Sequence, residues 1–476
     1  MTTLLINKPV NLRTSRRSGD SKPIKRLWLE GKKLLGLVPI GAKLALDDRQ
    51  DRLVATYSQA GTRTVSSRKD RFSELSLPLI EIDEGNSAFV AGLEDDAMLR
   101  YTITETSITV TVLQDRVRTK QIARETDALN TILRGEPLRK ATLFSGGACF
   151  DFCLHDGFER SGLASAVALA VDLEEHCIDN IATNAASMLS PDALLVASDI
   201  ALLNVDNQLP QYHCLSVTPP CVEASIAGKA SNGNTGETSR TAHLVYYYSR
   251  LIDQFNPIVF MMENVQAFSL EPSYKSLCGL LTHLGYTVQE RVINAYKEGF
   301  SLEARERLFM VAISNGMSDM EFDLADVKCI DTVPQTLGEI MEDIPADSSR
   351  WSPKTGLVEK QARDIKKKNG FRMQVYTAKS LFINTLRKGY QKSGSSDPLI
   401  AHPKKALFRI LSAVEHARVK MIPESLFHGV SEGKAHSMLG NGVIGSIGRA
   451  IGYALGLALQ AWANKRHMES QSQMAA

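Results

Sequence analysis

Three apolar segments that each end in an acidic residue constrain the fold of this chain more than any other feature. The acids are Asp172, Asp199 and Glu263. Short apolar segments of this kind are typical of buried strands in a parallel sheet, and the carboxyl ends of such strands meet at one edge, where α/β enzymes bind their ligands. We therefore predict an α/β fold in which these three side chains face one crevice.

A glycine-containing turn precedes these segments. The apolar residues 141–144 lead into Gly146 and Gly147, and a helical stretch follows. Glycines in such a place let the backbone approach a ligand closely at the start of a helix. Asp172 follows roughly thirty residues later, in the place where a Rossmann-type fold contacts a ribose hydroxyl.

Cys221 directly follows two prolines, Pro219 and Pro220, after the apolar residues 213–217. Two consecutive prolines fix their own backbone angles and restrict the residue before them, so the next side chain stands on a rigid loop. A thiol held in this way suggests a nucleophile, which needs a neighbour that supplies acid. Glu263 is the candidate, because a carboxyl group shielded from water can hold a proton for donation, although an isolated acid at a strand end more often only caps the strand.

In this order, the motifs resemble the cytosine-5 DNA methyltransferases that use S-adenosylmethionine. The resemblance covers roughly residues 141–462. It rests on motifs that occur in the family's order. These are Phe144-Ser145-Gly146, the proline-cysteine loop with Ser225 and residues 227–229, residues 263–265, residues 303–308, Arg409 with residues 415–418 and Pro423, and residues 440–443. It implies an α/β, Rossmann-like S-adenosylmethionine-dependent methyltransferase fold with a mostly parallel sheet. A small target-recognition region and an N-terminal β-rich domain would complete the chain, and the C-terminal helix would pack back beside the first strands.

The resemblance also implies catalytic roles. The Cys221 thiolate would add to carbon 6 of cytosine, Glu263 would protonate or hydrogen-bond ring nitrogen 3, and Arg307 would bind the keto oxygen. Arg305 would lie on the same strand face as Arg307 if the strand is continuous, and would contact a phosphate. The alternative for both arginines is a solvated strand face. A base inside a duplex cannot reach these groups, so the target must be flipped out.

Cofactor contacts follow from the same resemblance. The residues implied are Phe144 and Gly146 for the methionine part, Asp172 for the ribose, Asp199 with Ile200 for the adenine, and Pro220, Leu244 and Asn441 for closing the pocket. The sequence departs from the family pattern at Thr142 (usually an acid), Ala148 (usually glycine), Leu173 (usually aromatic), and Val222 and Glu303 (both usually glutamine). These departures place the chain on a divergent branch and bear on cofactor affinity.

With 476 residues the chain is long enough for several domains. In chain order we predict a basic disordered tail (1–26), a small β-rich accessory domain that could bind DNA (27–113), a linker helix (114–137), the catalytic core (138–314), the target-recognition region (315–408), the C-terminal part of the catalytic domain (409–465) and a flexible tail (466–476). Alternating apolar residues predict strands at 53–57, 79–82, 101–104 and 108–112, and the last two form a hairpin.

Lysines and arginines in the target-recognition region are candidate DNA contacts. Lys366, Lys367 and Lys368 are expected to neutralise backbone phosphates, since a lysine is a point charge without a fork. Arg363 and Arg372 could offer bidentate contacts to guanine. The expected partner is therefore double-stranded DNA, and self-association could occur through the N-terminal domain.

Cysteine and apolar patterns predict the compartment. The seven cysteines show no regular framework, and no N-terminal segment resembles a signal peptide or a membrane span. We expect a cytoplasmic protein that associates with the nucleoid through DNA and contacts no membrane. Cys149, Cys153 and His155 are close in sequence, as are His176 and Cys177, but nothing completes four ligands, so no metal is expected.

Two alternatives share the predicted fold. One is an RNA cytosine-5 methyltransferase, as in the branch of the family that acts on transfer RNA. The other is a catalytically inactive DNA-binding regulator, which the departures at Thr142, Ala148 and Val222 suggest. The basic N-terminal segment favours DNA over RNA, because it would be drawn to duplex phosphates.

Overall fold

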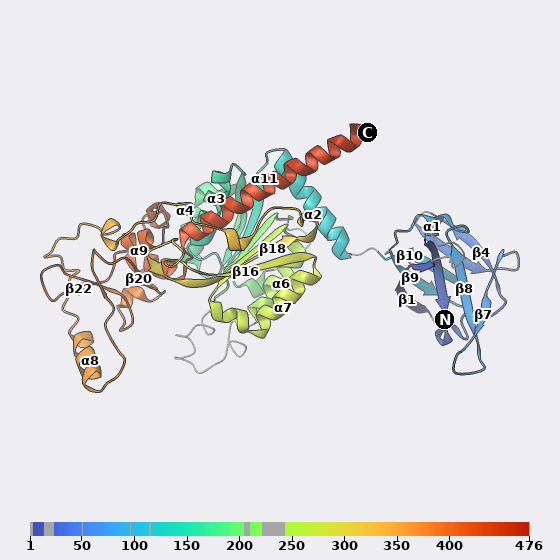
Figure 1. Ribbon diagram of the computed structural model, residues 1–476, viewed down its shortest axis with the longest axis horizontal. Coiled ribbons are helices and arrows are strands. Elements are labelled where there is room, and N and C mark those ends of the chain that lie inside the picture. Colours follow the sequence, from blue (N-terminus) through green and yellow to red (C-terminus); the bar gives the residue numbers. More distant parts are fainter. Residues whose placement is uncertain are drawn as a thin grey trace. The chain divides into compact units, whose positions relative to one another are not determined.

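The chain folds into two compact units, Met1–Thr119 and Lys120–Ala476, in this computed structural model (Figure 1). The structure describes residues 3–13, 23–49, 51–95, 97–113, 116–203, 210–220 and 243–475. Each unit has a hydrophobic core of its own, so each is treated by itself.

Two antiparallel sheets form the N-terminal unit. One has the order β1-β9-β10-β5-β4-β6 and the other β2-β3-β8-β7. The elements are β1 (Leu4–Pro9), β2 (Asn11–Arg13), β3 (Ile24–Glu30), η1 (Lys32–Leu34), β4 (Lys43–Asp48), β5 (Arg52–Tyr57), β6 (Arg63–Thr64), β7 (Ser66–Lys69), β8 (Ser76–Asp83), α1 (Ala88–Ala91), β9 (Met98–Ile103) and β10 (Ser107–Val112). Alternate residues of both sheets, such as Leu27 and Ile80 on one and Leu53 and Tyr101 on the other, bury into a shared core. The predicted hairpin is confirmed as β9 and β10.

The prediction of a disordered tail over residues 1–26 was wrong for the described part of that segment. β1 pairs with β9, and β2 pairs with β3. The physical reason is that Leu4, Ile6 and Val10 pack against the core of this unit, which the positive charges of the segment concealed. Arg16, Arg17 and Lys22 lie outside the described residues.

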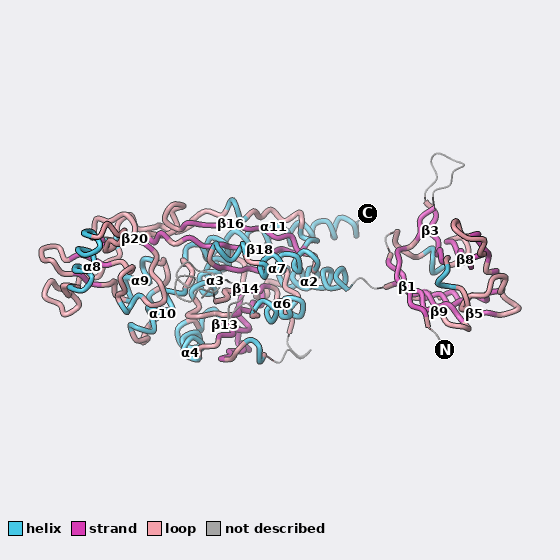
Figure 2. The backbone as a smooth tube through the Cα atoms, turned by 90° about the horizontal axis from the view of Figure 1, so that it is seen from below, coloured by secondary structure: helices cyan, strands magenta, loops and turns pink. Residues whose placement is uncertain are grey.

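A seven-stranded sheet with the order β13-β12-β11-β14-β15-β18-β16 forms the centre of the second unit (Figure 2). The four neighbouring pairs from β13 to β15 are parallel, and the two pairs that involve β18 are antiparallel. The strands are β11 (Leu138–Leu143), β12 (Ser165–Asp172), β13 (Leu189–Ala197), β14 (Cys214–Val217), β15 (Val259–Asn264), β16 (Tyr286–Asn294) and β18 (Glu306–Ser314).

Helices and short 3-10 turns cover both faces of this sheet. Val259 and Met261 of β15 belong to one core cluster, with α3 and α11, and Phe260 and Met262 belong to the other, with α6 and α7. The elements are α3 (Cys149–Ser161), α4 (Glu175–Asn184), η2 (Ala186–Met188), η3 (Ile200–Leu202), α6 (Leu244–Phe255), η5 (Gln266–Leu270), α7 (Pro272–His283), η6 (Asn315–Met317), η7 (Leu324–Asp326), α9 (Ala413–Val419), η10 (Glu424–Phe427), α10 (Glu432–Asn441) and α11 (Gly445–Ala475).

The predicted linker helix is present as α2 (Arg116–Leu133) and belongs largely to the second unit. Its Arg124 is buried, stacks over the ring of Tyr286 at 3.9 Å, and donates hydrogen bonds to Ser314 Oγ (2.8 Å) and to the carbonyl oxygen of Gly285 (2.7 Å). Lys120 pairs with Asp253 at 2.6 Å. The helix is therefore a docked part of the second unit rather than a free connector.

Helix α11 packs along α3. A methyl group added to Gly452 would lie 2.3 Å from the carbonyl oxygen of Leu154, and one added to Gly157 would lie 2.2 Å from that of Arg449, so the two helices touch through their backbones. The predicted flexible tail over 466–476 is wrong for the described residues, since the helix continues to Ala475 and Arg466 pairs with Asp319 at 2.9 Å.

No single described helix has the length and apolar composition to cross a membrane. The pair α10 and α11, bent by 49°, meets that test jointly by length and composition. The inner face of α11 is buried in the core that it shares with α3, where Ile447, Ile451 and Leu455 contribute.

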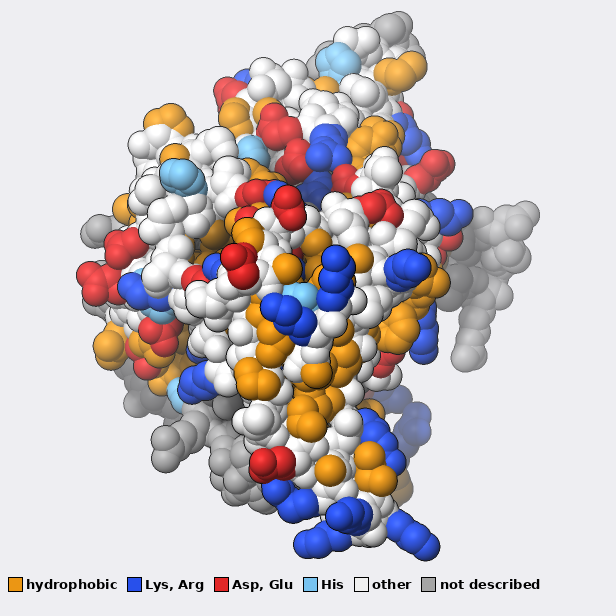
Figure 3. Space-filling view, turned by 90° about the vertical axis from the view of Figure 1, so that its left-hand side faces the viewer, with side chains coloured by type: hydrophobic (Ala, Val, Ile, Leu, Met, Phe, Trp, Pro, Cys, Tyr) orange, Lys and Arg blue, Asp and Glu red, His pale blue; other side chains and the backbone are white. Residues whose placement is uncertain are grey.

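The predicted target-recognition region consists of short elements around a small core of its own. Its elements are η8 (Leu337–Glu339), α8 (Thr355–Lys366), β19 (Val375–Tyr376), β20 (Ile383–Asn384), η9 (Tyr390–Lys392), β21 (Leu399–Ala401) and β22 (Phe408–Arg409), and β17 (Glu303–Ala304) pairs with β20. Leu337, Ile383 and Tyr390 are buried in that core. Figure 3 shows this end of the molecule, with Lys and Arg side chains gathered at its lower tip, where α8 lies.

Candidate active site

The predicted functional residues follow strands that are neighbours in the sheet. Leu143 pairs with both Val171 and Val217, and Val217 pairs with Met262. Because β12, β11, β14 and β15 run parallel in this register, the residues after their carboxyl ends meet at one edge. These four strands therefore end at the same edge of the sheet, and the prediction that Asp172, Asp199 and Glu263 face one crevice stays a prediction.

Asp172 holds the glycine turn in place. Its Oδ2 accepts the backbone N–H of Gly146 at 2.7 Å, and its Oδ1 accepts that of Glu174 at 2.9 Å. Gly146 has a φ of 52°, in the left-handed region where glycine is unstrained. The turn and the end of β12 are thereby fixed to each other.

The space beside Gly146 is open. No atom lies within 4 Å of the position that a methyl group on Gly146 would occupy. Asp199 accepts the N–H of Ala201 at 2.9 Å and starts η3, in which Ile200 is buried, and Leu244 begins α6 and packs partly against the same core. Acids next to apolar side chains match the ribose and adenine of S-adenosylmethionine, so the residues present fit this cofactor.

Two family departures flank the turn. Ala148 has a φ of 63° and ψ of 15°, a left-handed conformation that glycine adopts without strain. Leu173 is 67% exposed at the open edge of the sheet. The family's glycine at this position would adopt the left-handed conformation without strain, and this chain adopts the same conformation with Ala148.

The loop that leads to Cys221 is anchored at its start. Thr218 Oγ1 donates to the carbonyl oxygen of Phe144 at 2.8 Å, and the side-chain amide of Asn264 donates to the carbonyl oxygen of Pro219 at 3.4 Å. These contacts tie Pro219 to the ends of β11 and β15. Cys221 itself, like Val222 and Ser225, lies outside the described residues.

Glu263 and Arg307 form an ion pair at the same edge. Glu263 Oε1 lies 3.1 Å from Arg307 Nε, and their side chains are 8% and 18% exposed. Arg307 stands next to Leu308, which pairs with Asn264 in the antiparallel ladder of β15 and β18. A carboxylate and a guanidinium, both largely removed from water, can act together on one substrate ring.

Arg305 does not lie at the surface, where a phosphate contact was expected. It stands between β17 and β18, so the continuous strand that the prediction assumed is interrupted. Its side chain is 3% exposed and faces Glu303 and the carbonyl oxygen of Asn441. The phosphate contact is therefore replaced by contacts inside the protein.

Asp151 is a buried acid that sequence reasoning missed. It lies on α3, accepts a short hydrogen bond from Ser216 Oγ, and also contacts Thr142, whose position usually holds an acid. Burial raises the pKa of the Asp151 carboxyl group. A carboxyl group from the helix thus stands beside the position where the strand lacks one, and only the fold reveals it.

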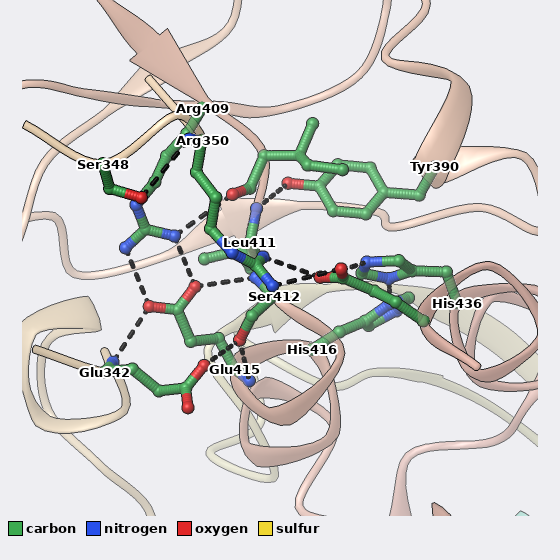
Figure 4. Close-up of polar contacts among 12 residues, drawn as sticks. Glu342, Ser348, Arg350, Tyr390, Arg409, Leu411, Ser412, Glu415, His416 and His436 are labelled. Atoms are coloured by element: carbon green, nitrogen blue, oxygen red, sulfur yellow. Dashed lines mark hydrogen bonds and ion pairs between the residues drawn. The ribbon is translucent and has the colours of Figure 1, made fainter. Parts of the chain in front are cut away.

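A polar cluster joins the target-recognition region to α9 (Figure 4). Glu415 forms a two-pronged contact with Arg409, at 2.8 Å for one of its hydrogen bonds, and accepts the backbone N–H of Glu342 at 2.9 Å. Beside it, His416 and His436 share a hydrogen bond between their Nδ1 atoms at 2.9 Å. Burial lowers the pKa of both imidazoles, so both are uncharged near neutral pH.

Comparison with known proteins defines the class. The family model of C-5 cytosine-specific DNA methylases matches residues 138–456. The chain belongs to this family. As a C-5 cytosine-specific DNA methylase, it transfers a methyl group to carbon 5 of cytosine in DNA, and its family uses S-adenosylmethionine as the methyl donor. No group of residues suited to a metal ion is present in the part of the chain that the structure describes.

Relatives and solved structures agree with this class. The methylase is 28% identical to Type II methyltransferase M.NlaX of Neisseria lactamica, over 57% of this chain and 84% of the relative. It is 25% identical to Type II methyltransferase M.DsaV of Dactylococcopsis salina, over 61% and 79%. In fold it is similar to the S. pombe Dnmt2 methyltransferase, with a TM-score of 0.52 at 16% identity over 68% of this chain and 99% of that one.

Proposed function

We propose that this methylase acts on a flipped-out cytosine of duplex DNA through a covalent bond to Cys221. The observation that favours this most is the ion pair of the buried Glu263 with the partly buried Arg307, next to the anchored loop of Pro219. The same edge offers an acid and a cation to one heterocyclic ring, and the nucleophile is assigned to Cys221, which follows Pro219 and Pro220 in the sequence. A paired, stacked base cannot enter such an edge, which is why flipping belongs to the proposal.

In the proposed reaction, the Cys221 thiolate forms a bond to carbon 6, and the electron pair of the carbon 5–carbon 6 double bond becomes available at carbon 5. Glu263 donates to ring nitrogen 3, and Arg307 donates to the keto oxygen, where negative charge develops. S-adenosylmethionine supplies the methyl group that carbon 5 accepts. The proton on carbon 5 then leaves to solvent, ring nitrogen 3 returns its proton to Glu263 as the carbon 6–sulfur bond breaks, and the thiolate is recovered.

We propose that Asp172 and its neighbours bind the cofactor. Phe144, Gly146, Ile200 and Leu244 would line the pocket, with Asp199, Pro220 and Asn441 at its ends. The Rossmann-like character of the mostly parallel sheet is part of this proposal, because it puts the pocket beyond the carboxyl ends of β11, β12 and β13.

Asp172→Ala should weaken S-adenosylmethionine binding at least about tenfold, because it removes both a ribose acceptor and the bond that holds the N–H of Gly146. Isothermal titration calorimetry with the cofactor alone checks this. Glu174→Ala, at an exposed neighbouring position, is the matched control. An unchanged cofactor affinity in Asp172→Ala would remove Asp172 from the pocket.

DNA and RNA substrates are distinguished by trapping. Duplex DNA that carries 5-fluorocytosine, with S-adenosylmethionine present, should form a covalent complex that survives denaturing electrophoresis, because fluorine cannot leave as the proton does. An RNA hairpin with the same base should not. Trapping on RNA alone would favour the RNA alternative, and trapping on neither would favour an inactive regulator.

The tip of the target-recognition region is proposed to contact DNA. Lys366, Lys367 and Lys368 are exposed at the end of α8 and are assigned to phosphates. Arg372 is held by the carbonyl oxygen of Phe371 at 2.7 Å, and Arg363 lies 3.8 Å from Glu359. Both arginines keep donors for a base edge.

The N-terminal unit is proposed to bind DNA through the hairpin of β7 and β8. All four residues of β7 are exposed, and Phe72 at the tip is 92% exposed. The tip is closed by the bond from Asp70 N–H to the carbonyl oxygen of Leu75 (2.9 Å), and Lys32 pairs with Asp70 at 2.8 Å. An ordered tip with an exposed aromatic ring beside basic residues resembles the wedges that proteins insert between base steps.

Phe72→Ala should weaken binding of the full chain to a 30-bp duplex at least about fivefold while S-adenosylmethionine affinity stays unchanged, because only a base-step contact is lost. Fluorescence anisotropy measures the first and calorimetry the second. Leu5→Ala, another exposed apolar residue of this unit, is the control. An equal affinity of Phe72→Ala and Leu5→Ala for the duplex would exclude the wedge.

Self-association through this unit and association with the nucleoid stay predictions.

A further inference from the structure

A buried charge cluster of Glu303, Arg305 and Lys420 lies behind the proposed active site. Glu303 Oε2 is 2.8 Å from Lys420 Nζ, and Glu303 Oε1 is 3.7 Å from Arg305 Nη1. The side chains of Glu303 and Lys420 are fully buried, and that of Arg305 is 3% exposed. One fully buried carboxylate therefore faces two cations.

This cluster joins three parts of the chain that are distant in sequence. The backbone N–H of Leu386, in the target-recognition region, donates to Glu303 Oε1 at 3.0 Å. Lys420 follows α9, and its carbonyl oxygen accepts the N–H of Gly445, at the start of α11, at 2.8 Å. Glu303 is thus the common partner of the DNA-contacting region and the C-terminal helices.

The third connection leads to the cofactor side. Arg305 Nη2 donates to the carbonyl oxygen of Asn441 at 3.4 Å. The next residue, Gly442, is so close to α3 that an added methyl group would lie 2.6 Å from Cys149 Sγ. Cys149 begins the helix after the glycine turn of Gly146. The contact of Arg305 with Asn441, and that of the next residue Gly442 with Cys149, therefore connect the charge cluster to the edge of the proposed cofactor pocket.

Stability alone does not account for these charges. Burying ions removes their hydration, and apolar side chains of similar volume usually stabilise a fold as well or better. Burial and the neighbouring Arg305 lower the pKa of Lys420 to about 8, against the opposing effect of Glu303. Because burying these charges costs free energy, we infer that the cluster serves to hold neighbouring groups in position.

We propose that Glu303 and Lys420 are positioning residues that hold Arg305 against the Asn441 carbonyl, so that docking of the target-recognition region orders the cofactor edge. Lys420 is the closer partner of Glu303, at 2.8 Å, whereas Arg305 lies 3.7 Å from Glu303. Arg305 therefore stays near Glu303 and keeps its hydrogen bond to the carbonyl oxygen of Asn441. Glu303 in turn fixes Leu386 and the region that reads DNA. The proposal rests on the cofactor site proposed above.

Three variants of the full chain test this. Glu303→Gln leaves Arg305 and Lys420 facing each other without a carboxylate, so we expect the KM for S-adenosylmethionine to rise about tenfold, with a smaller change in kcat. Lys420→Met removes the second cation at similar length. Glu303→Gln/Lys420→Met removes one charge of each sign and should recover part of the Tm lost in Glu303→Gln, while its KM for the cofactor stays raised, because Arg305 has lost its carboxylate. Glu306→Gln, an exposed acid nearby, should match the parent.

A double variant with both the parental Tm and the parental KM would overturn the proposal, since the cluster would then be purely structural. So would a Glu303→Gln variant with an unchanged KM. Should Glu303→Gln fail to fold, the double variant alone decides between the outcomes. Cofactor binding by the parent, weakened in Asp172→Ala, tests the proposed pocket independently of this result.

Discussion

Cys221→Ala is expected to reduce methyl transfer to DNA by at least about a thousandfold, because no covalent bond to carbon 6 can then form. The other six cysteines cannot substitute for it. Burial raises the pKa of each of them, for example to about 12 for Cys214 and to about 11 for Cys278, so they remain protonated near neutral pH. Only a thiolate adds to the ring.

The measurement is transfer of labelled methyl groups to duplex DNA, together with trapping on 5-fluorocytosine. Cys278→Ala, which replaces a half-buried thiol on α7, is the matched control and should retain parental activity. Circular dichroism verifies that both variants are folded. Methylation by Cys221→Ala near the parental rate would refute the nucleophile assignment.

Glu263→Gln is expected to slow turnover by about a hundredfold or more, which is the usual effect of losing a general acid. The amide keeps the shape of the side chain but cannot exchange a proton with ring nitrogen 3, and it removes the carboxylate that lies 3.1 Å from Arg307 Nε. The KM for S-adenosylmethionine should change little, because Glu263 is assigned to the base and not to the cofactor.

Steady-state kinetics with both substrates varied separate these effects. Glu290→Gln changes an exposed acid of β16 and provides the control. Covalent trapping by Glu263→Gln should become slow without disappearing, since Cys221 is intact. If Glu263→Gln turns over at the parental rate, its carboxyl group only caps β15.

Strand ends could be predicted from the sequence because their signal is local. Each apolar segment with a terminal acid became a strand of the central sheet, and Asp172 and Glu263 lie at its edge as expected. Arg305 could not be placed in the same way. Arg305 contacts the carbonyl oxygen of Asn441, and its ion-pair partner Glu303 contacts Lys420. Both contacts join residues more than a hundred positions apart, so only the three-dimensional packing reveals them.

Two further differences have the same origin. Asp151 lies on a helix, where a single acid in the sequence gives no sign that it is buried and reaches Ser216 on a strand. The first strand of the N-terminal unit was missed because its short alternation of Leu4 and Ile6 stands beside many positive charges, and charge is a weak guide to pairing. Contacts between distant segments, rather than local preferences, decided both cases.

The backbone contact between α3 and α11 has a consequence for how the chain acquires its fold during synthesis. Gly157 emerges from the ribosome almost three hundred residues before its partner Arg449. Gly442 packs against Cys149, which begins the helix after the glycine turn. The sheet edge that holds this turn is therefore incomplete until nearly the whole chain has been translated. Premature termination before α11 should consequently yield a chain with no usable cofactor edge, and nascent methylase would be inactive until its final helix docks.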